Sequence, residues 1–154
     1  MYKRVLIPLD GSTLAEGIVP FILDIAGPLD LDLVLVRVQQ PIAPQAIEGT
    51  LHFTVDDIAA RLKAAREYLA RVAADLRGRG LRVTTDARYG EPVAEIVAAA
   101  RETGAGMIAM TTHGRSGLSK LVFGSVAEAV LRRAAIPVLM MRLTKDAVAA
   151  VQAA

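Results

Sequence analysis

A glycine-bearing loop in the last third of the chain carries the residues best suited to chemistry. Gly114 and Gly117 are separated by two residues, and Gly124 with Ser125 follows a few positions later. Glycine lets the backbone approach a ligand closely and present main-chain N–H groups to it. Gly124 and Ser125 begin a predicted helix, whose unpaired N–H groups and positive dipole end attract phosphate. The pattern predicts an anion site that would suit a triphosphate.

Side chains near this loop could support an anion, but each has a structural alternative. The Ser125 hydroxyl can donate a hydrogen bond, and Arg115 and Lys120 could neutralise charge or be solvated. Ser125 and Glu128 also form a capping box, so that Ser125 starts its helix, contacts a ligand, or does both. The loop matches neither the Walker A pattern nor the G-x-G-x-x-G dinucleotide fingerprint. The spacing alone therefore does not identify the ligand.

Two further polar residues have both a structural and a functional interpretation. Asp10 follows a predicted strand and either caps the turn that it begins or contacts a ligand. His113 could act as a base, but no carboxylate partner is evident in the sequence, and packing within the loop is the favoured role. The sequence therefore offers no paired nucleophile and base, and no catalytic or metal-ligating residue is predicted.

The composition is that of a globular protein with weak overall electrostatics. The chain has 154 residues, of which 53% are apolar and 22% charged, with a formal net charge of +2 and no cysteine. The lack of cysteine excludes disulfides and thiolate metal sites and is typical of a reducing compartment, so a cytoplasmic protein is expected. The apolar run at 5–9 is too short for a signal-peptide core. The small net charge gives no reason to expect nucleic acid or a membrane as a partner.

Short apolar runs alternate with segments of helical period along the chain. Apolar runs bounded by turn residues predict buried strands at 5–9, 31–38, 81–87, 107–110 and 137–143. Helices are predicted at 13–26, along an apolar stripe between 58 and 76, at 92–103 and at 124–135. Thr13 and Glu16 form a capping box for the first helix, and Pro20 predicts a kink or a break within it. The segments 39–51 and 111–123 are predicted to be loops.

This alternation predicts one α/β domain over residues 1–143, followed by a tail at 144–154. Right-handed βαβ crossovers place helices on both faces of a five-stranded parallel sheet, which is a Rossmann-like architecture. We expect the strand order 3-2-1-4-5, which the pattern alone does not fix. In that order the loops that begin at Asp10 and Thr111 are neighbours at the carboxyl edge of the sheet, where such folds bind ligands.

One segment carries a specific family resemblance. Residues 110–126 read MTTHGRSGLSKLVFGSV, which resembles the nucleotide loop of the universal stress protein family, G-x2-G-x9-G-[ST]. Gly114, the nine intervening residues and Gly124 with Ser125 match, whereas Thr111 stands where the family has its first glycine. The segments VLIPLDGS at 5–12, GEP at 90–92 and IPVLMMR at 136–142 are also similar to the family. The resemblance therefore covers nearly the whole chain and implies a universal stress protein domain at 1–143.

The resemblance implies a protein that binds ATP, with or without Mg²⁺, as a regulatory or stress-response switch. In ATP-binding members the first-strand aspartate and the end of the second strand hold adenine and ribose, and the glycine loop holds the phosphates. Thr111 could crowd the ribose or contribute its hydroxyl. The nucleotide-binding residues implied by matching positions are Pro8, Leu9, Asp10, Val38, Met110, Thr111, Gly114, Arg115, Gly117, Gly124, Ser125 and Val126.

The resemblance also implies a homodimer through the last strand, from Pro137 to Arg142. That segment is apolar, and an uncovered apolar edge strand favours association. Two alternatives stay open, namely a nucleotide-free dimeric interaction module and a weak ATPase. Sequence support for an enzyme is thin, because no acidic cluster for magnesium accompanies Asp10.

Overall fold

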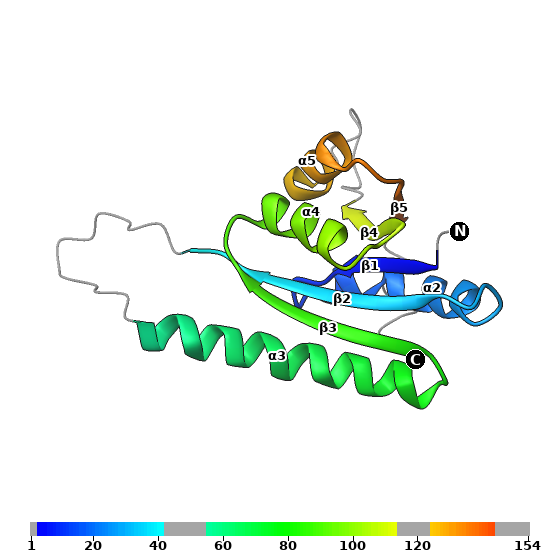
Figure 1. Ribbon diagram of the computed structural model, residues 1–154, viewed down its shortest axis with the longest axis horizontal. Coiled ribbons are helices and arrows are strands. Elements are labelled where there is room, and N and C mark those ends of the chain that lie inside the picture. The colour runs from blue at the N-terminus through cyan, green and yellow to red at the C-terminus, as the bar shows by residue number, and fades with distance from the viewer. Residues whose placement is uncertain (1–2, 42–54, 114–123, 144–154) are drawn as a thin grey trace.

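A computed structural model describes residues 3–41, 55–113 and 124–143 of the chain (Figure 1). Within these residues, five parallel strands form one sheet in the order β3-β2-β1-β4-β5, which confirms the predicted Rossmann-like α/β fold. The strands are β1 (Arg4–Pro8), β2 (Asp32–Gln39), β3 (Arg82–Tyr89), β4 (Met107–His113) and β5 (Val138–Leu143). The helices are α1 (Thr13–Glu16), α2 (Ile18–Ala26), α3 (Val55–Gly78), α4 (Pro92–Glu102) and α5 (Ser125–Arg133).

The central strands β1 and β2 are apolar along most of their length because helices cover both faces of the sheet (Figure 1). Successive side chains of a strand point to opposite faces. Val5 and Ile7 of β1 join a core with residues of α2 and α3, whereas Leu6 joins a second core with residues of α4 and α5. All three side chains are at most 1% exposed. β1 therefore anchors both helical layers at the centre of the sheet.

The predicted helix 13–26 is interrupted, and the interruption lies at Gly17 rather than at Pro20. The chain forms α1, turns at Gly17 and continues as α2 with Gly17 as its N-cap. Pro20 thus falls in the first turn of α2, where its missing N–H would have no intrahelical partner. The N-cap of α1 is Ser12, not Thr13. Glu16 does not complete a capping box but accepts a 2.6 Å hydrogen bond from the Tyr68 hydroxyl of α3.

Several predicted boundaries differ from the structure by a few residues. β4 continues through His113, so the predicted loop from 111 starts later than expected, and β3 continues to Tyr89. On α3, Leu69 and Leu76 of the predicted stripe are buried, while Ile58 and Leu62 are only half-buried. Most of the predicted loop at 39–51, part of the loop at 111–123 and the tail from 144 lie outside the described residues.

Among the described helices, none has the length and apolar character needed to span a membrane.

Candidate functional site

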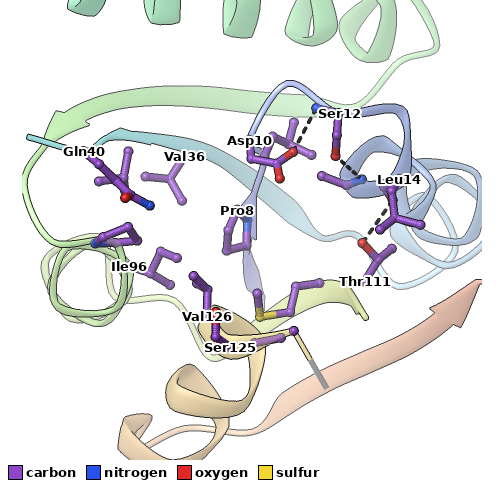
Figure 2. A pocket seen from close by; sticks show the side chains of 17 residues that line it. Pro8, Asp10, Ser12, Leu14, Val36, Gln40, Ile96, Thr111, Ser125 and Val126 are labelled. Carbon is purple, nitrogen blue, oxygen red and sulfur yellow. Dashed lines mark hydrogen bonds between the residues drawn. The ribbon is translucent and has the colours of Figure 1, made fainter. Parts of the chain in front are cut away.

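The carboxyl ends of the central strands border a pocket of about 260 Å³ (Figure 2). β1 pairs with β4 at Val5–Met107 and Leu6–Ile108, and their ladder ends there. The chain then leaves β1 for α1, on the α2–α3 face, while β4 is followed by α5 on the opposite face. This divergence opens a crevice at the switch in strand order. The described lining residues are Pro8, Leu9, Asp10, Ser12, Leu14, Ala15, Val36, Val38, Gln40, Pro92, Ile96, Met110, Thr111, Gly124, Ser125, Val126 and Ala127.

Nine of the twelve residues predicted to bind nucleotide line this pocket. They are Pro8, Leu9, Asp10, Val38, Met110, Thr111, Gly124, Ser125 and Val126. Gly114, Arg115 and Gly117 lie outside the described residues, as does Lys120. His113 ends β4, but its side chain is also outside the described part. The fold therefore brings together predicted residues from four separate segments of the chain.

The end of β2 forms one wall of the pocket and extends beyond β1. The last pair between the two strands is Pro8 with Val36, and the Leu9 N–H donates to the Val36 carbonyl at 2.8 Å. Val38 lies two residues after Val36, so its N–H and C=O point to the same side of β2 as those of Val36. At this position β1 has already ended. The backbone groups of Gln39 point to the other side of β2, toward β3, since the Gln39 carbonyl accepts from the Gly90 N–H at 3.0 Å. The Val38 backbone is therefore aimed toward the crevice.

The turn after β1 presents Asp10 to the pocket and is fixed by its own hydrogen bonds. The Ser12 N–H donates to Asp10 Oδ1 at 2.8 Å, and the Ser12 hydroxyl accepts from the Ala15 N–H at 3.1 Å (Figure 2). Asp10 thus has the predicted turn-capping role and also lines the pocket. Its other carboxylate oxygen, Oδ2, takes no part in this turn. Among the described lining residues, Asp10 is the one with an ionisable side chain.

The first turn of α5 borders the pocket with backbone N–H groups that have no partner within the helix. The N-cap is Gly124, which makes no side-chain capping bond, and Ser125 is the first helical residue. The predicted capping box at Ser125 is therefore not formed. Glu128 pairs instead with Arg132 at 2.6 Å, while its N–H donates to the Gly124 carbonyl at 2.9 Å. The N–H groups of Ser125, Val126 and Ala127 precede the first intrahelical bond, and all three residues line the pocket.

A charged and aromatic cluster lies close to the Asp10 turn at Gly11. Gly11 has a φ of +87°, and a Cβ at this position would lie 2.9 Å from Arg37 Nη2. The Arg37 guanidinium carbon lies 4.5 Å from the centre of the Tyr68 ring. Burial raises the pKa of the Tyr68 hydroxyl, and so does its hydrogen bond to Glu16. The tyrosine therefore stays protonated and acts as the donor to Glu16.

Another carboxylate organises the α4 side of the pocket. Glu91 caps α4 by accepting from the N–H groups of Ala94 at 2.7 Å and Val93 at 3.1 Å, and these bonds lower its pKa. Pro92, at the first position of α4, then lines the pocket. Within the described residues, no group of three or more acidic or histidine side chains has a metal-binding arrangement.

Comparison with known proteins identifies the family. The model of the universal stress protein family matches residues 1–142. The chain belongs to the universal stress protein family. The universal stress protein MJ0531 of Methanocaldococcus jannaschii is 31% identical over 147 residues, which cover 94% of this chain and 85% of the relative. The solved structure of MJ0577 has a TM-score of 0.72 and 26% identity, with 94% of this chain and 99% of that chain covered. The resemblance found in the sequence is thus confirmed at the level of the family.

Some universal stress proteins with this fold have been solved with nucleotides. One is a complex with cAMP, with a TM-score of 0.61 and 23% identity over 92% of this chain and 97% of that one. Another, from Archaeoglobus fulgidus, is a complex with dAMP, with a TM-score of 0.62 and 22% identity over 90% and 97% of the two chains. At these identities the likeness establishes a shared fold. Adenine nucleotides are therefore ligands of some members that have this fold.

The structure gives the hydroxyl of Thr111 a protein partner. Thr111 Oγ1 donates to the Leu14 carbonyl of α1 at 3.0 Å (Figure 2). The two sequence-based expectations were that Thr111 crowds a ribose or offers it a hydroxyl. The observed bond adds a third role, because the hydroxyl proton is already used within the protein.

Eight lining residues were not predicted from the sequence. Val36 and Gln40 share the strand face of Val38 and could have been found from the two-residue period of β2. Ala127 could have been found from the helix start at Gly124. Ser12, Leu14 and Ala15 belong to α1 and its cap, and Pro92 and Ile96 belong to α4. Their positions depend on how helices pack over the sheet, which no local pattern specifies.

Proposed function

We propose that this universal stress protein binds ATP, or a closely related adenine nucleotide, in the central pocket and acts in the cytoplasm as a regulatory or stress-response switch. The observation that carries the proposal is the pairing of an apolar wall with a row of backbone donors. Val36 and Ile96 lie on one side of the pocket, and the first turn of α5 lies on another (Figure 2). Val38 also lines the pocket. An aromatic base and a phosphate chain need these two surroundings.

The charges and donors of the pocket favour one orientation of the nucleotide. Phosphates are placed at the free N–H groups of α5, where the helix dipole is positive. The carboxylate of Asp10 would repel phosphate but can accept hydrogen bonds from ribose hydroxyls through Oδ2. The N–H and C=O of Val38 can pair with the donor and acceptor on the edge of a base. The base is therefore assigned to the β2 wall and the sugar to Asp10.

The family and its solved members support the choice of ligand. Members with the same fold have been solved with cAMP and with dAMP, both adenine nucleotides. The loop sequence of this chain retains Gly114, Gly124 and Ser125 in the spacing of the ATP-binding motif. A triphosphate can bring Mg²⁺ with it, held by its own oxygens. We therefore propose ATP, with or without Mg²⁺, as the ligand, and binding rather than hydrolysis as the main activity.

Nucleotide binding is tested on the purified protein. We expect mass spectrometry of gently denatured protein to recover an adenine nucleotide, or calorimetric titration with ATP to show micromolar affinity. Replacing Gly124 with leucine should abolish binding, because a bulky side chain would enter the phosphate end of the pocket. The fold should persist, since Gly124 has a φ of −55° that any residue adopts.

A matched control and two contrary outcomes make this test decisive. Gly27→Leu introduces the same side chain at a helix end with a φ of −62° and no atom within 4 Å of the new Cβ, so ATP affinity should not change. Unchanged affinity in Gly124→Leu would show that the site assignment is wrong. A wild-type protein that neither retains nor binds nucleotide would instead favour the alternative of a nucleotide-free interaction module.

We also propose that the protein forms a homodimer through β5. β5 lies at one edge of the sheet, and Val138, Leu139, Met140 and Met141 are all only half-buried. The Pro137 carbonyl accepts from the Ile108 N–H of β4 at 3.0 Å, so odd-numbered residues of β5 direct their backbone groups toward β4. Even-numbered residues, such as Met140, direct theirs outward. An apolar edge with free backbone groups is a natural surface for a second copy of the chain.

A further inference from the structure

The single-turn helix α1 has little to hold it in place on its own. It spans four residues, and none of its side chains is fully buried. One helical turn has no cooperative stabilisation, because the cost of nucleation is not recovered by further turns. Besides the packing of Ala15 on the α2–α3 core and the Tyr68–Glu16 hydrogen bond, the conformation of α1 therefore depends on hydrogen bonds at its two ends.

Those two ends are fixed by different parts of the chain. At the N-terminal end, the Ser12 hydroxyl accepts from the Ala15 N–H, and the Ser12 N–H donates to Asp10 Oδ1. At the C-terminal end, the Leu14 carbonyl accepts from the Gly17 N–H at 3.1 Å and from Thr111 Oγ1 at 3.0 Å. The Thr111 bond joins residues 97 positions apart and is a hydrogen bond between α1 and β4.

We infer that Thr111 is a positioning residue that sets the Asp10 side of the pocket. Its hydroxyl fixes α1 against β4, α1 carries Ser12, and the Ser12 N–H orients the Asp10 carboxylate. Thr111 also lines the pocket, so α1, Asp10 and the end of β4 form one connected wall. This role needs the hydroxyl of Thr111 as a donor to protein, and not as a ligand contact. Its consequence for ligand affinity rests on the proposed nucleotide function, whereas its consequence for α1 does not.

Two conservative substitutions separate the hydroxyl from the methyl group. Thr111→Val keeps the shape and removes the donor, and Thr111→Ser keeps the donor and removes the methyl. The Leu14 carbonyl retains its bond from Gly17 in both, so both variants should fold. From the usual contribution of one hydrogen bond, we expect Thr111→Val to bind ATP about 3- to 10-fold more weakly and to exchange the Ala15, Glu16 and Gly17 amide hydrogens faster by a similar factor. Thr111→Ser should resemble the wild type in both measurements.

Hydrogen exchange without ligand keeps this inference separate from the proposed function. Faster exchange at α1 in Thr111→Val, rescued in Thr111→Ser, supports the positioning role even if the wild type does not bind ATP. Unchanged exchange at α1 in Thr111→Val would overturn it. If ATP affinity falls while exchange at α1 stays the same, the hydroxyl contacts the ligand directly and the positioning role is wrong.

Discussion

Gly11 offers the sharpest test of how the Asp10 turn is held. Its φ of +87° lies in the left-handed region, which costs an L-residue about 1–2 kcal/mol. A Cβ there would also lie 2.9 Å from Arg37 Nη2, at the flexible end of that side chain. Arg37 could move aside, but it would leave its position over the Tyr68 ring, an interaction worth about 0.5–1 kcal/mol. We therefore expect Gly11→Ala to lower the free energy of unfolding by about 1.5–3 kcal/mol.

The matched control is Gly27→Ala. Gly27 has a φ of −62°, and nothing lies within 4 Å of a Cβ built on it. Alanine at such a position should leave stability unchanged or raise it by up to about 1 kcal/mol. Urea unfolding followed by circular dichroism measures both variants, and in a chain of this size a loss of 2 kcal/mol corresponds to about 4–8 °C in Tm. The affinity of Gly11→Ala for ATP should also fall, because Asp10 is the preceding residue.

Equal stability of the two alanine variants would refute this reasoning. Repeating Gly11→Ala in a protein that also carries Arg37→Met separates the two contributions to the expected loss of stability, namely backbone strain and displacement of Arg37. If backbone strain dominates, Gly11→Ala should still cost about 1–2 kcal/mol when the guanidinium is absent. If the cost disappears in that background, displacement of Arg37 is the cause and the left-handed conformation is not.

Two further predictions concern acid stability and assembly. Because the folded-state pKa of Glu91 is lowered, its stabilising contribution is complete above the ordinary carboxyl value of about 4.3 and is lost as pH falls through the lowered value. Glu91→Gln should therefore flatten the decline of the urea midpoint below about pH 4.3, and an unchanged pH profile would contradict the capping role. Met140→Pro should give a monomer in light scattering, because it removes an outward-facing N–H of β5 and leaves the β4 ladder intact. Met140→Leu keeps the N–H and should remain a dimer, and a dimeric Met140→Pro would exclude pairing through this edge.

The sheet could be predicted from the sequence because its strands carry their own signal. Val5, Leu6 and Ile7 point to alternate faces and are all apolar, which requires cover on both sides and so predicts a parallel sheet between helices. The pocket residues in the turn after β1 and at the start of α5 follow from that topology. These are positions where a strand ends or a helix begins, and local sequence marks both.

Other features were not predicted correctly, either because a different local arrangement formed or because a distant residue supplied the contact. Pro20 predicted a kink or a break within the first helix, but the break lies at Gly17. A new helix begins after Gly17, and Pro20 lies in its first turn, where proline is tolerated. Ser125 and Glu128 have the spacing of a capping box, yet Glu128 pairs with Arg132. The role of Thr111 depends on the Leu14 carbonyl, 97 residues away in the chain. Of these three features, the Thr111 bond joins distant residues, whereas the Glu128–Arg132 pair lies within α5 and is a local alternative to the predicted capping box.

The two walls of the pocket belong to different cores, and this bears on how a ligand would act. Asp10 and α1 are supported from the α2–α3 face, where Ala15 packs on that core, whereas α5 contributes Ala127 and Val130 to the core shared with α4. A nucleotide bound between Asp10 and α5 would therefore connect the two helical layers at a place where the β1–β4 ladder has ended. Each layer has its own buried contacts with β1. Binding at 100 times Kd would add about 2.7 kcal/mol to the free energy of unfolding, because a ligand that binds only the folded state stabilises that state.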